Sequence, residues 1–386
     1  MKGLTRFFRG GFMEGIEGIE RIEFIGKIDF IGRMGRMGKM GRVFSVISMV
    51  SIISVISIFS LTSCDVHEWP KDNYGEVPFV LNLDFSTALP LYREITYVRG
   101  GEEAALQSPL QSDVRYIISV CRKGTREEVS RHVFTRPYDG ELDYTTTLLL
   151  GEGEWDIYAW ADYVDMGSRT DKFYTTADFS NITYSDRDNY TGSNDCRDAF
   201  RGSVSVDVVH PDRFLDNETL PSYTATADMQ RPMGRYEVIA TDVDDFLTRV
   251  ATMRTRDGAS DTRVDIADFN VIVRYNAFMP CSFNIFTDKP SDSWTGMSFG
   301  SKMMLADEGM TLAFDYVLVN GSETTMNINI EVYDKDGTML SVTRGIEVPI
   351  VRSKLTIVKG EFLTSSASGG VTINPGYEDD YNIEIK

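Results

Sequence analysis

A cysteine that could carry a covalent lipid is the residue with the most definite chemistry in this sequence. Cys64 ends the run of residues 43–64, VFSVISMVSIISVISIFSLTSC, in which no side chain is charged. Basic residues precede this run at Arg33, Arg36, Lys39 and Arg42. A basic start, an apolar stretch and small residues at a cleavage site are typical of a secretory signal. Cleavage before Cys64 would leave its thiol free to receive a lipid.

The end of the run, Leu61-Thr62-Ser63-Cys64, matches the lipobox of bacterial lipoproteins. In that motif the thiol takes a diacylglycerol, and the cysteine becomes the first residue of the mature chain. The alternative is a transmembrane helix, because about 20 apolar residues can span a bilayer. No basic cluster follows Cys64, which favours cleavage. We therefore expect residues 1–63 to be a low-complexity lead and a lipoprotein signal peptide, and acyl chains on Cys64 to hold the protein on a membrane.

The residue types that serve catalysis or bind metals are not arranged for either task. His67, His132 and His210 are isolated from one another in the sequence. There is no His-Glu-x-x-His motif, no phosphate-binding loop with Gly-Lys-Ser/Thr and no Gly-x-Ser-x-Gly elbow. The sequence thus predicts that the protein is not an enzyme, and it predicts no metal site and no cofactor apart from the lipid on Cys64.

The remaining cysteines and the net charge narrow the range of partners. Cys121, Cys196 and Cys281 are too widely spaced for a clustered zinc site or a disulfide framework, and we expect Cys121 and Cys281 to be buried thiols in strands. One disulfide among the three stays open, because an exported chain meets an oxidising compartment. The net charge of −19 would repel nucleic acid and anionic lipid head groups, so neither is an expected partner.

Aromatic side chains are concentrated in one strand-like stretch, EWDIYAWADYV. Trp155, Tyr158 and Trp160 could form a platform that stacks on sugar rings. Core packing and contact between domains are the more common roles of such residues. The stretch leaves open an alternative function, that of a surface glycan-binding lipoprotein in a polysaccharide-uptake system.

Most of the chain after Cys64 has the pattern of short strands. Alternating apolar residues begin in PFVLNLDF, residues 78–85, and β-branched and aromatic runs then recur at short intervals with Gly, Asp and Pro between them. Residues 64–77 form a polar tether, and residues 78–210 and 224–386 form two strand-rich blocks. Residues 165–200 are expected to be a long, partly ordered excursion. The expected fold is all-β, with two tandem β-sandwich domains.

Two local elements of the second block can be predicted in more detail. Residues 242–252 predict a helix that Asp242 caps, with an apolar stripe at Phe246, Leu247 and Val250. The segment NINIEVYDKDGTMLSV predicts a hairpin around Asp336-Gly337, a pair favoured in type I′ turns.

Several segments resemble one family along the whole mature chain. They are CDVHEWP after the lipobox, VPFVLNLDF, GEWDIYAWADYVD, DAFRGSVSV, MQRPMGRYEVIATDVDDFL and VPIVRSKLTIVKGEFLT. These segments are similar to parts of the fimbrillin-related lipoproteins of the Bacteroidales, and most of all to an uncharacterised group beside the fimbrial anchors and minor subunits. The resemblance implies two transthyretin-like β-sandwiches, and it contributes no catalytic residues.

The resemblance also implies a way of assembling. In the members that polymerise, a protease cuts after an arginine near the first strand, and the groove that opens accepts a strand from the next subunit. Arg93 and Arg99 lie where such a cut would fall, although an ordinary strand or loop position is the more common role of such arginines. Anchor members keep the lipid and the first strand, and so they end the fibre at the membrane.

The function expected from the sequence is that of a lipid-anchored outer-membrane protein, exposed at the cell surface, that serves as a fimbrial anchor or subunit in adhesion. Asp65, Glu68 and Asp72 resemble the acidic signals that send lipoproteins of the Bacteroidota to the cell surface, and they also suit an ordinary solvated linker. The expected partners are the membrane and fimbrial subunits, with glycans as the alternative.

Overall fold

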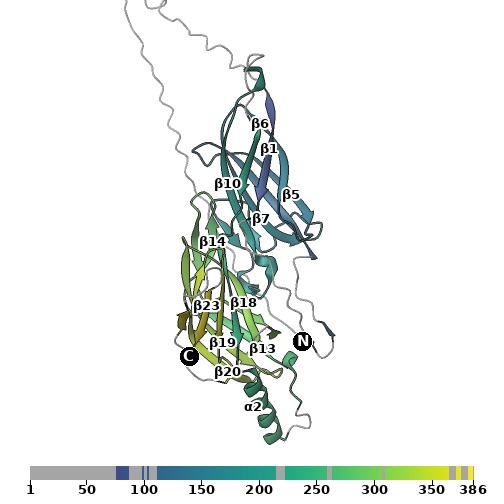
Figure 1. Ribbon diagram of the computed structural model, residues 1–386, viewed down its shortest axis with the longest axis vertical. Helices are drawn as coiled ribbons and strands as arrows, with labels where there is room; N and C mark the ends of the chain where they lie inside the picture. The colour runs from purple at the N-terminus through teal and green to yellow at the C-terminus, as the bar shows by residue number, and fades with distance from the viewer. Residues whose placement is uncertain are drawn as a thin grey trace, which may run out of the picture. The chain divides into compact units, whose positions relative to one another are not determined.

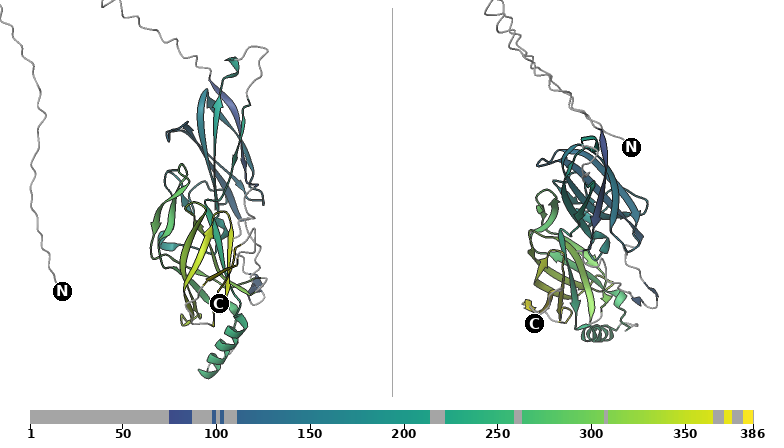
Figure 2. Two further views of the ribbon diagram at one scale, coloured as in Figure 1. Left: turned by 60° about the vertical axis from the view of Figure 1, so that its left-hand side comes forward. Right: turned by 45° about the horizontal axis from the view of Figure 1, so that its top comes forward.

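The computed structural model of the chain describes residues 75–86, 98–99, 102–103, 111–213, 222–258, 263–306, 309–364, 371–374 and 381–385. These residues all belong to one compact unit, Asn73–Lys386. Strands make up most of them, as Figures 1 and 2 show, and the expected all-β fold of packed sheets is confirmed. The expected lead and signal peptide, residues 1–63, lie outside the described residues. None of the described helices is both long enough and apolar enough to cross a membrane.

The first pair of sheets is built mainly from the N-terminal half of the unit. One sheet has the strand order β11–β1–β6, and the other has the order β10–β7–β4–β5. Tyr116 of the second sheet stacks on Tyr144 of the first, with 4.3 Å between their ring centroids, so the two sheets share one core. The strands are β1 (Glu76–Asp84), β4 (Ser112–Arg122), β5 (Glu128–Pro137), β6 (Tyr144–Gly151), β7 (Gly153–Asp165), β10 (Ala199–Val208) and β11 (Thr224–Asp228).

The second pair of sheets follows along the chain. Its larger sheet has the order β17–β18–β12–β21–β23–β22, and its smaller sheet has the order β16–β13–β19–β20. The hydroxyls of Tyr236 (β12) and Tyr275 (β13) lie 2.9 Å apart and connect the two sheets. The strands are β12 (Met233–Ala240), β13 (Asn270–Tyr275), β16 (Ser298–Ser301), β17 (Met304–Leu305), β18 (Met310–Leu318), β19 (Glu323–Tyr333), β20 (Met339–Val351), β21 (Leu355–Gly360), β22 (Val371–Asn374) and β23 (Tyr381–Ile385).

Strand pairs connect the two expected blocks. A further sheet has the order β15–β14–β9–β8, with β8 (Tyr174–Thr175) and β9 (Ile182–Tyr184) from the first block and β14 (Met279–Asn284) and β15 (Lys289–Trp294) from the second. In addition, β11 comes from the expected second block but pairs with β1. The expected domain boundary between residues 210 and 224 stays a prediction, and the strands on its two sides are interleaved.

The expected excursion at residues 165–200 is an ordered part of the core. Besides β8 and β9 it carries two short 3-10 helices, η2 (Arg187–Asn189) and η3 (Asp195–Arg197), and its Tyr174, Tyr184 and Tyr190 are buried. The polar composition was misleading because its charged groups pair with one another inside the protein, as Arg197 and Asp186 do at 2.9 Å. Two further 3-10 helices are η4 (Pro211–Arg213) and η5 (Ile266–Asp268).

The predicted helix is present as α2 (Val243–Arg256), with Phe246 and Val250 buried. It lies against the β19–β20 hairpin (Figures 1 and 2), where Arg254 Nη2 donates to a carboxylate oxygen of Asp334 at 3.1 Å. Asp242 occupies the N-cap position, but its side chain makes no capping bond. Its carboxylate instead accepts hydrogen bonds from the backbone of Leu363 and Thr364, so the expected capping role is wrong.

The predicted hairpin of β19 and β20 is confirmed, but its turn differs from the expected type I′. The Gly337 N–H donates to the carbonyl of Asp334, and the Asp334 N–H donates to the carbonyl of Thr338. Gly337 has a φ of 79°, whereas Asp336 has no positive φ, which a type I′ turn would require. The chain therefore turns through three residues and places its glycine in the left-handed position that closes such a loop.

Candidate functional site

The first strand of the unit, β1, is the feature that bears most directly on the expected function. It lies between two other strands, pairing in parallel with β11 and antiparallel with β6. Its side chains alternate strictly between the interior and the outer face. The inward set is almost completely buried and consists of Val77, Phe79, Leu81 and Leu83. Removal of β1 would therefore open an apolar groove in the middle of this sheet, with β11 and β6 as its edges.

Contacts at the middle of β1 and at its C-terminal end hold it in register. The Val80 N–H donates to the carbonyl of Tyr223 at 2.7 Å, and the carbonyl of Asp84 accepts from Met229 N at 2.8 Å. Directly after the strand, the Phe85 ring meets the Phe200 ring edge to face, with centroids 5.1 Å apart. The structure therefore shows β1 seated in its groove along its whole length.

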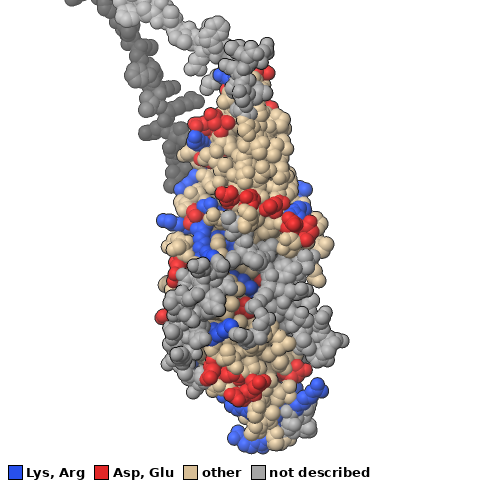
Figure 3. Space-filling view, in the orientation of Figure 1, with Lys and Arg blue, Asp and Glu red and all other residues tan. Residues whose placement is uncertain are grey.

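The outer face of this sheet is uncharged along the middle of β1, from Pro78 to Asn82, between the acidic residues Glu76 and Asp84. Asn82 lies opposite Thr145 and Thr226 on the neighbouring strands, and Thr145 Oγ1 donates to Asn82 Oδ1 at 2.8 Å. In Figure 3 this region of the molecule is a wide area without charged side chains, where Figure 1 labels β1 and β6. The net charge of the protein is −19, so most of its surface repels other copies of the chain. An uncharged face is a part of the surface where this repulsion is weaker.

The two arginines proposed for proteolytic maturation follow β1 in sequence. Arg99 belongs to a two-stranded ribbon of β2 (Val98–Arg99) and β3 (Glu102–Glu103). Arg93 lies outside the described residues, and so does Cys64, the expected lipidation site. Cleavage at either arginine and lipidation of Cys64 stay predictions.

The three aromatic residues proposed to stack on glycans do not form an open platform. Trp160 has an exposed fraction of 0% and Trp155 one of 8%, so both rings pack inside the protein. The Trp160 ring meets Tyr174 edge to face at 5.4 Å, and Trp155 Nε1 donates to the carbonyl of Gly151. Tyr158 is half-buried, and its ring packs edge-on against Phe286 at 4.8 Å. The placement of these residues matches the core role that the sequence left as the alternative.

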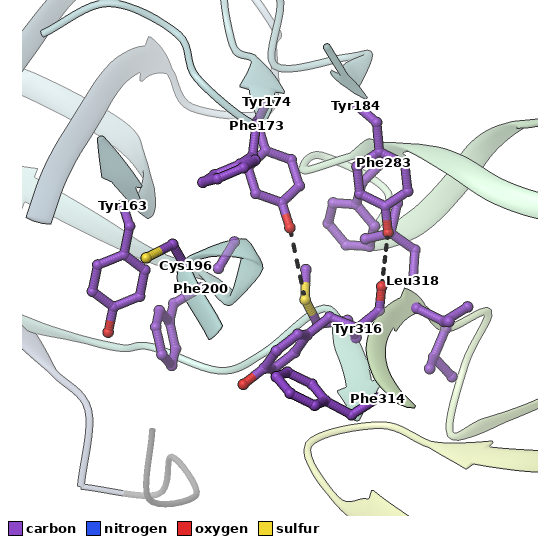
Figure 4. Close-up of a cluster of buried hydrophobic side chains, with 14 of the residues drawn as sticks. Tyr163, Phe173, Tyr174, Tyr184, Cys196, Phe200, Phe283, Phe314, Tyr316 and Leu318 are labelled. Carbon is purple, nitrogen blue, oxygen red and sulfur yellow. Dashed lines mark hydrogen bonds between the residues drawn. The ribbon is translucent and has the colours of Figure 1, made fainter. Parts of the chain in front are cut away.

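A cluster of buried tyrosines, arginines and carboxylates holds the interleaved strands together, and Figure 4 shows buried apolar side chains of the same region, Tyr184 and Tyr316 among them. The hydroxyls of Tyr190 and Tyr275 both donate to Asp315, at 2.9 and 2.6 Å. The Tyr184 hydroxyl donates to the carbonyl of Tyr316 at 3.3 Å, one of the bonds drawn in Figure 4. Burial raises the pKa of Asp315 to about 6, with hydrogen bonds acting in the opposite direction. These groups are fully enclosed, so they stabilise the fold and cannot meet a substrate.

The buried ion pairs of the same region follow this pattern. Arg231 and Asp198 form a bidentate pair, with 2.7 Å between Nη2 and Oδ2 and 2.8 Å between Nε and Oδ1. The guanidinium of Arg197 lies 4.0 Å from the ring centroid of Tyr190 and is fully buried. Buried charges need such partners, because desolvation otherwise exceeds what they contribute. These pairs could not be predicted from the sequence, because it is the fold that brings Arg231 to Asp198.

The cysteines and acidic side chains of the described residues form neither a reactive thiol site nor a metal site. Cys121 and Cys281 are buried free thiols in β4 and β14, as predicted, and Cys196 is a buried free thiol in η3. Burial raises the pKa of Cys281 to about 11, which disfavours the reactive thiolate. Within the part of the chain that the structure describes, no group of three or more His, Cys, Asp or Glu residues is placed to hold a metal ion.

Comparison with known proteins gives a family for this chain. The model of a family of unknown function, DUF6562, matches residues 75–386. No curated protein matches the chain. The relation to fimbrial anchors and minor subunits that the sequence suggested stays a prediction.

Solved structures similar to the chain include three from the Bacteroidales. A candidate adhesin from Bacteroides ovatus is 9% identical, with 69% of this chain and 77% of that chain covered and a TM-score of 0.37. A candidate cell adhesion protein from Bacteroides uniformis is 12% identical, with 81% and 96% covered and a TM-score of 0.37. A C-terminally truncated tip fimbrial protein from Porphyromonas gingivalis is 12% identical, with 81% and 98% covered and a TM-score of 0.36. These values are low, so the function has to be argued from the residues of this chain.

Proposed function

The chain belongs to the DUF6562 family, and we propose that it is a non-enzymatic adhesion protein of the cell surface that assembles with fimbrial subunits by β-strand addition. In this proposal the lipid on Cys64 holds the protein to the outer membrane. The observation that carries the proposal is the position of β1, which is at once the first strand of the compact unit and an inner strand of its sheet.

The position of β1 makes it separable from the rest of the unit. The residues directly before it belong to the expected tether, and the sequence that follows contains Arg93 and Arg99 before β4 begins at Ser112. A cut at either arginine would leave β1 held by hydrogen bonds and side-chain packing alone. A strand from another subunit could then replace it through the same main-chain bonds.

The inward side chains of β1 explain why the groove would not stay empty. Full burial of a Val, Leu or Phe side chain contributes about 1.5–3 kcal/mol, and four such side chains lie in this groove. An emptied groove would expose the facing apolar side chains, among them Leu148 and Leu150 of β6. A strand with apolar residues at every second position is the natural replacement, because side-chain direction alternates along a strand.

The two roles within the proposal differ in the fate of β1. A subunit that extends a fibre would lose β1 after cleavage and accept a strand in its place. An anchor would keep β1 and the lipid on Cys64, so that it ends the fibre at the membrane. The alternative of glycan binding at Trp155 and Trp160 is not proposed, because both rings are buried.

Peptide exchange tests the proposal directly. The purified full chain is cut with an arginine-specific protease and mixed with an excess of a labelled peptide of residues 76–85, with mass spectrometry and gel filtration as the readout. We expect the cut chain to take up the peptide and release its own β1 fragment, and the uncut chain to do neither. The same peptide carrying Leu81→Asp is the control, because a charge at a fully buried position cannot enter the groove.

The outcomes separate the roles. If the cut chain never exchanges β1, or takes up the Leu81→Asp peptide equally well, strand addition at this groove is wrong. A chain that resists cleavage at Arg93 and Arg99 excludes the fibre-extending role and retains the anchor role. Mass spectrometry of the membrane fraction tests the lipid separately, since an unmodified Cys64 would contradict the anchoring.

A further inference from the structure

A cleft lies beside the start of β5. None of the residues that line it belongs to β1, β6 or β11, the strands of the proposed groove. Its volume is about 380 Å³, which is within the range of roughly 300–1,000 Å³ of small-molecule sites. The side chains that line it and are used below are Arg126, Glu128, Arg131, Asp178, Phe179 and Phe286. They come from the turn before β5, from β5, from the loop between β8 and β9, and from the turn between β14 and β15.

The walls of the cleft are fixed by bonds within the protein. Asp178 Oδ1 accepts from Ser180 N at 2.7 Å, and Asp178 Oδ2 accepts from Ser180 Oγ at 2.8 Å, so the loop after β8 is held in a tight turn. The carbonyl of Phe179 accepts from Ile285 N at 2.9 Å, which joins this loop to the turn after β14. A site with walls already in place loses little entropy when a ligand binds.

The two arginines of the cleft differ in their engagement. Arg131 Nε donates to Glu128 at 3.0 Å, its Nη1 donates to the carbonyl of Thr176 at 2.8 Å, and its guanidinium lies 4.5 Å from the ring centroid of Phe179. The charge of Arg131 is thereby neutralised by Glu128, and its side chain is held in place. Arg131 connects β5 to the 176–180 loop, so side chains close the cleft between these two segments, and it is not an open strand edge there.

Arg126 is the cation of the cleft that has no carboxylate partner among the residues that the structure describes. Its guanidinium lies 5.6 Å from the ring centroid of Phe286, its side chain is exposed, and it makes no hydrogen bond or ion pair with another described residue. The Phe286 ring is itself held, because Tyr158 packs edge-on against it at 4.8 Å. A guanidinium supported by an aromatic face and free at its donors can bind a carboxylate through two parallel hydrogen bonds.

The acidic side chains of the cleft limit the kind of anion that fits. The Glu128 carboxylate is occupied by Arg131 and by Ser119 Oγ. Asp178 accepts two bonds from Ser180, which leaves about two of its four lone-pair positions for hydroxyl donors. A polyanion with adjacent charges would be repelled by these carboxylates. A ligand with one carboxylate and several hydroxyl groups would satisfy both Arg126 and Asp178.

We propose that this cleft binds a sugar that carries a single carboxylate, the uronic acid unit of an acidic glycan, with Arg126 as the carboxylate-binding residue. The volume suits one or two sugar rings, Asp178 accepts from sugar hydroxyls, and the phenylalanine rings provide the apolar walls. An acidic peptide would also offer a carboxylate, but not the row of adjacent hydroxyl groups that a sugar ring presents beside it. The site is independent of strand addition, so failure of either proposal does not affect the other.

Saturation-transfer NMR and titration calorimetry on the purified full chain test this site. The probes are methyl glucuronoside, the matched neutral methyl glucoside, and N-acetylglutamate amide as the peptide carboxylate. We expect the glucuronoside to bind most tightly. Arg126→Gln should weaken its binding roughly 10- to 100-fold, to the level of the glucoside, because a charge-assisted pair of hydrogen bonds is lost.

The matched control is Arg122→Gln. Arg122 is an exposed arginine of the preceding strand and pairs with Glu127 instead of lining the cleft. Its substitution should leave glucuronoside binding unchanged, and both variants should unfold at the temperature of the unmodified chain. The proposal is overturned by absence of glucuronoside binding, by equal binding of glucoside or N-acetylglutamate amide, or by equal losses in the two variants.

Discussion

Leu81 is the position where the role of β1 can be measured most simply. Its exposed fraction is 0%, and on the two neighbouring strands it lies opposite Ala225 and Thr146. Replacement of a buried leucine by alanine costs about 2–5 kcal/mol, depending on how far the surroundings can close over the cavity. Strands hydrogen-bonded on both sides of β1 leave little room for closure, so we expect a loss of about 3–5 kcal/mol in the free energy of unfolding.

Val80 provides a matched control in the same strand. It lies next to Leu81 but points to the outer face, where it is half-buried opposite Thr147 and Thr224. Val80→Ala removes strand propensity and some packing, so we expect the free energy of unfolding to fall by about 1 kcal/mol or less. Urea unfolding followed by tryptophan fluorescence would give both values, with the slope of the free energy against urea unchanged between variants. Equal effects of the two substitutions would mean that β1 is not packed into the core, and the reasoning about its groove would then be refuted.

Three further predictions concern the interior and the C-terminal part of the unit. The pKa of Asp315 is raised from 3.8 to about 6, so the protonated carboxyl contributes about 3 kcal/mol to stability below about pH 4, and this contribution is lost as the pH rises through about 6. Urea unfolding between pH 4 and 7 should show the free energy of unfolding falling with pH in the unmodified chain and not in Asp315→Asn. An equal dependence on pH in the two proteins would contradict the prediction. Asp242→Ala should lower the free energy of unfolding by about 2–4 kcal/mol, because the backbone donors of residues 363 and 364 lose their acceptor. The control, Asp244→Ala, lies at an exposed position of the first helical turn and should lower it by about 1 kcal/mol or less. Losses of the same size would argue that Asp242 does not hold residues 363 and 364 in place. Iodoacetamide at neutral pH should leave Cys121, Cys196 and Cys281 unmodified in the folded chain and alkylate all three in urea, as peptide mass spectrometry would show. Labelling of any of the three in the native chain would contradict their burial.

The strands could be predicted from the sequence because their signal is local. The alternation of Phe79, Leu81 and Leu83 has a period of two, and the structure places all three side chains inward. The α2 stripe of Phe246 and Val250 has helical spacing, and both side chains are buried. In each case the residues that decide the outcome lie within a few positions of one another.

The partners of these elements could not be predicted, because they depend on residues far apart in the sequence. Asp242 is a good N-cap by type and place, yet its carboxylate accepts from Leu363 and Thr364 more than a hundred positions later. In the same way, the aromatic stretch around Trp160 could equally face solvent or the core until Tyr174 and Phe283 are known to cover it. The cleft was not foreseen for the same reason, since Arg126 and Phe286 meet only in the fold.

Composition was the least reliable guide, and residues 165–200 show why. A polar segment is read as solvated because unpaired charges are costly to bury. Here Arg197 is fully buried, but its ion pair with Asp186 and the rings of Tyr184 and Tyr190 replace water around the guanidinium. Composition counts the charges and cannot show whether each one has a partner.

The interleaved strands bear on how the unit would respond to loss of β1. The β9–β14 pair and the bonds from Tyr190 and Tyr275 to Asp315 connect the two strand blocks at residues other than those of β1. Among the described strands, β11 and β6 pair with β1 directly, and β11 is additionally joined to β10 through the backbone bonds between Arg201 and Gln230 that follow it. Exchange of the first strand would thus disturb one sheet while the connection between the two strand blocks persists. A subunit that carries load while it exchanges strands has to meet this condition.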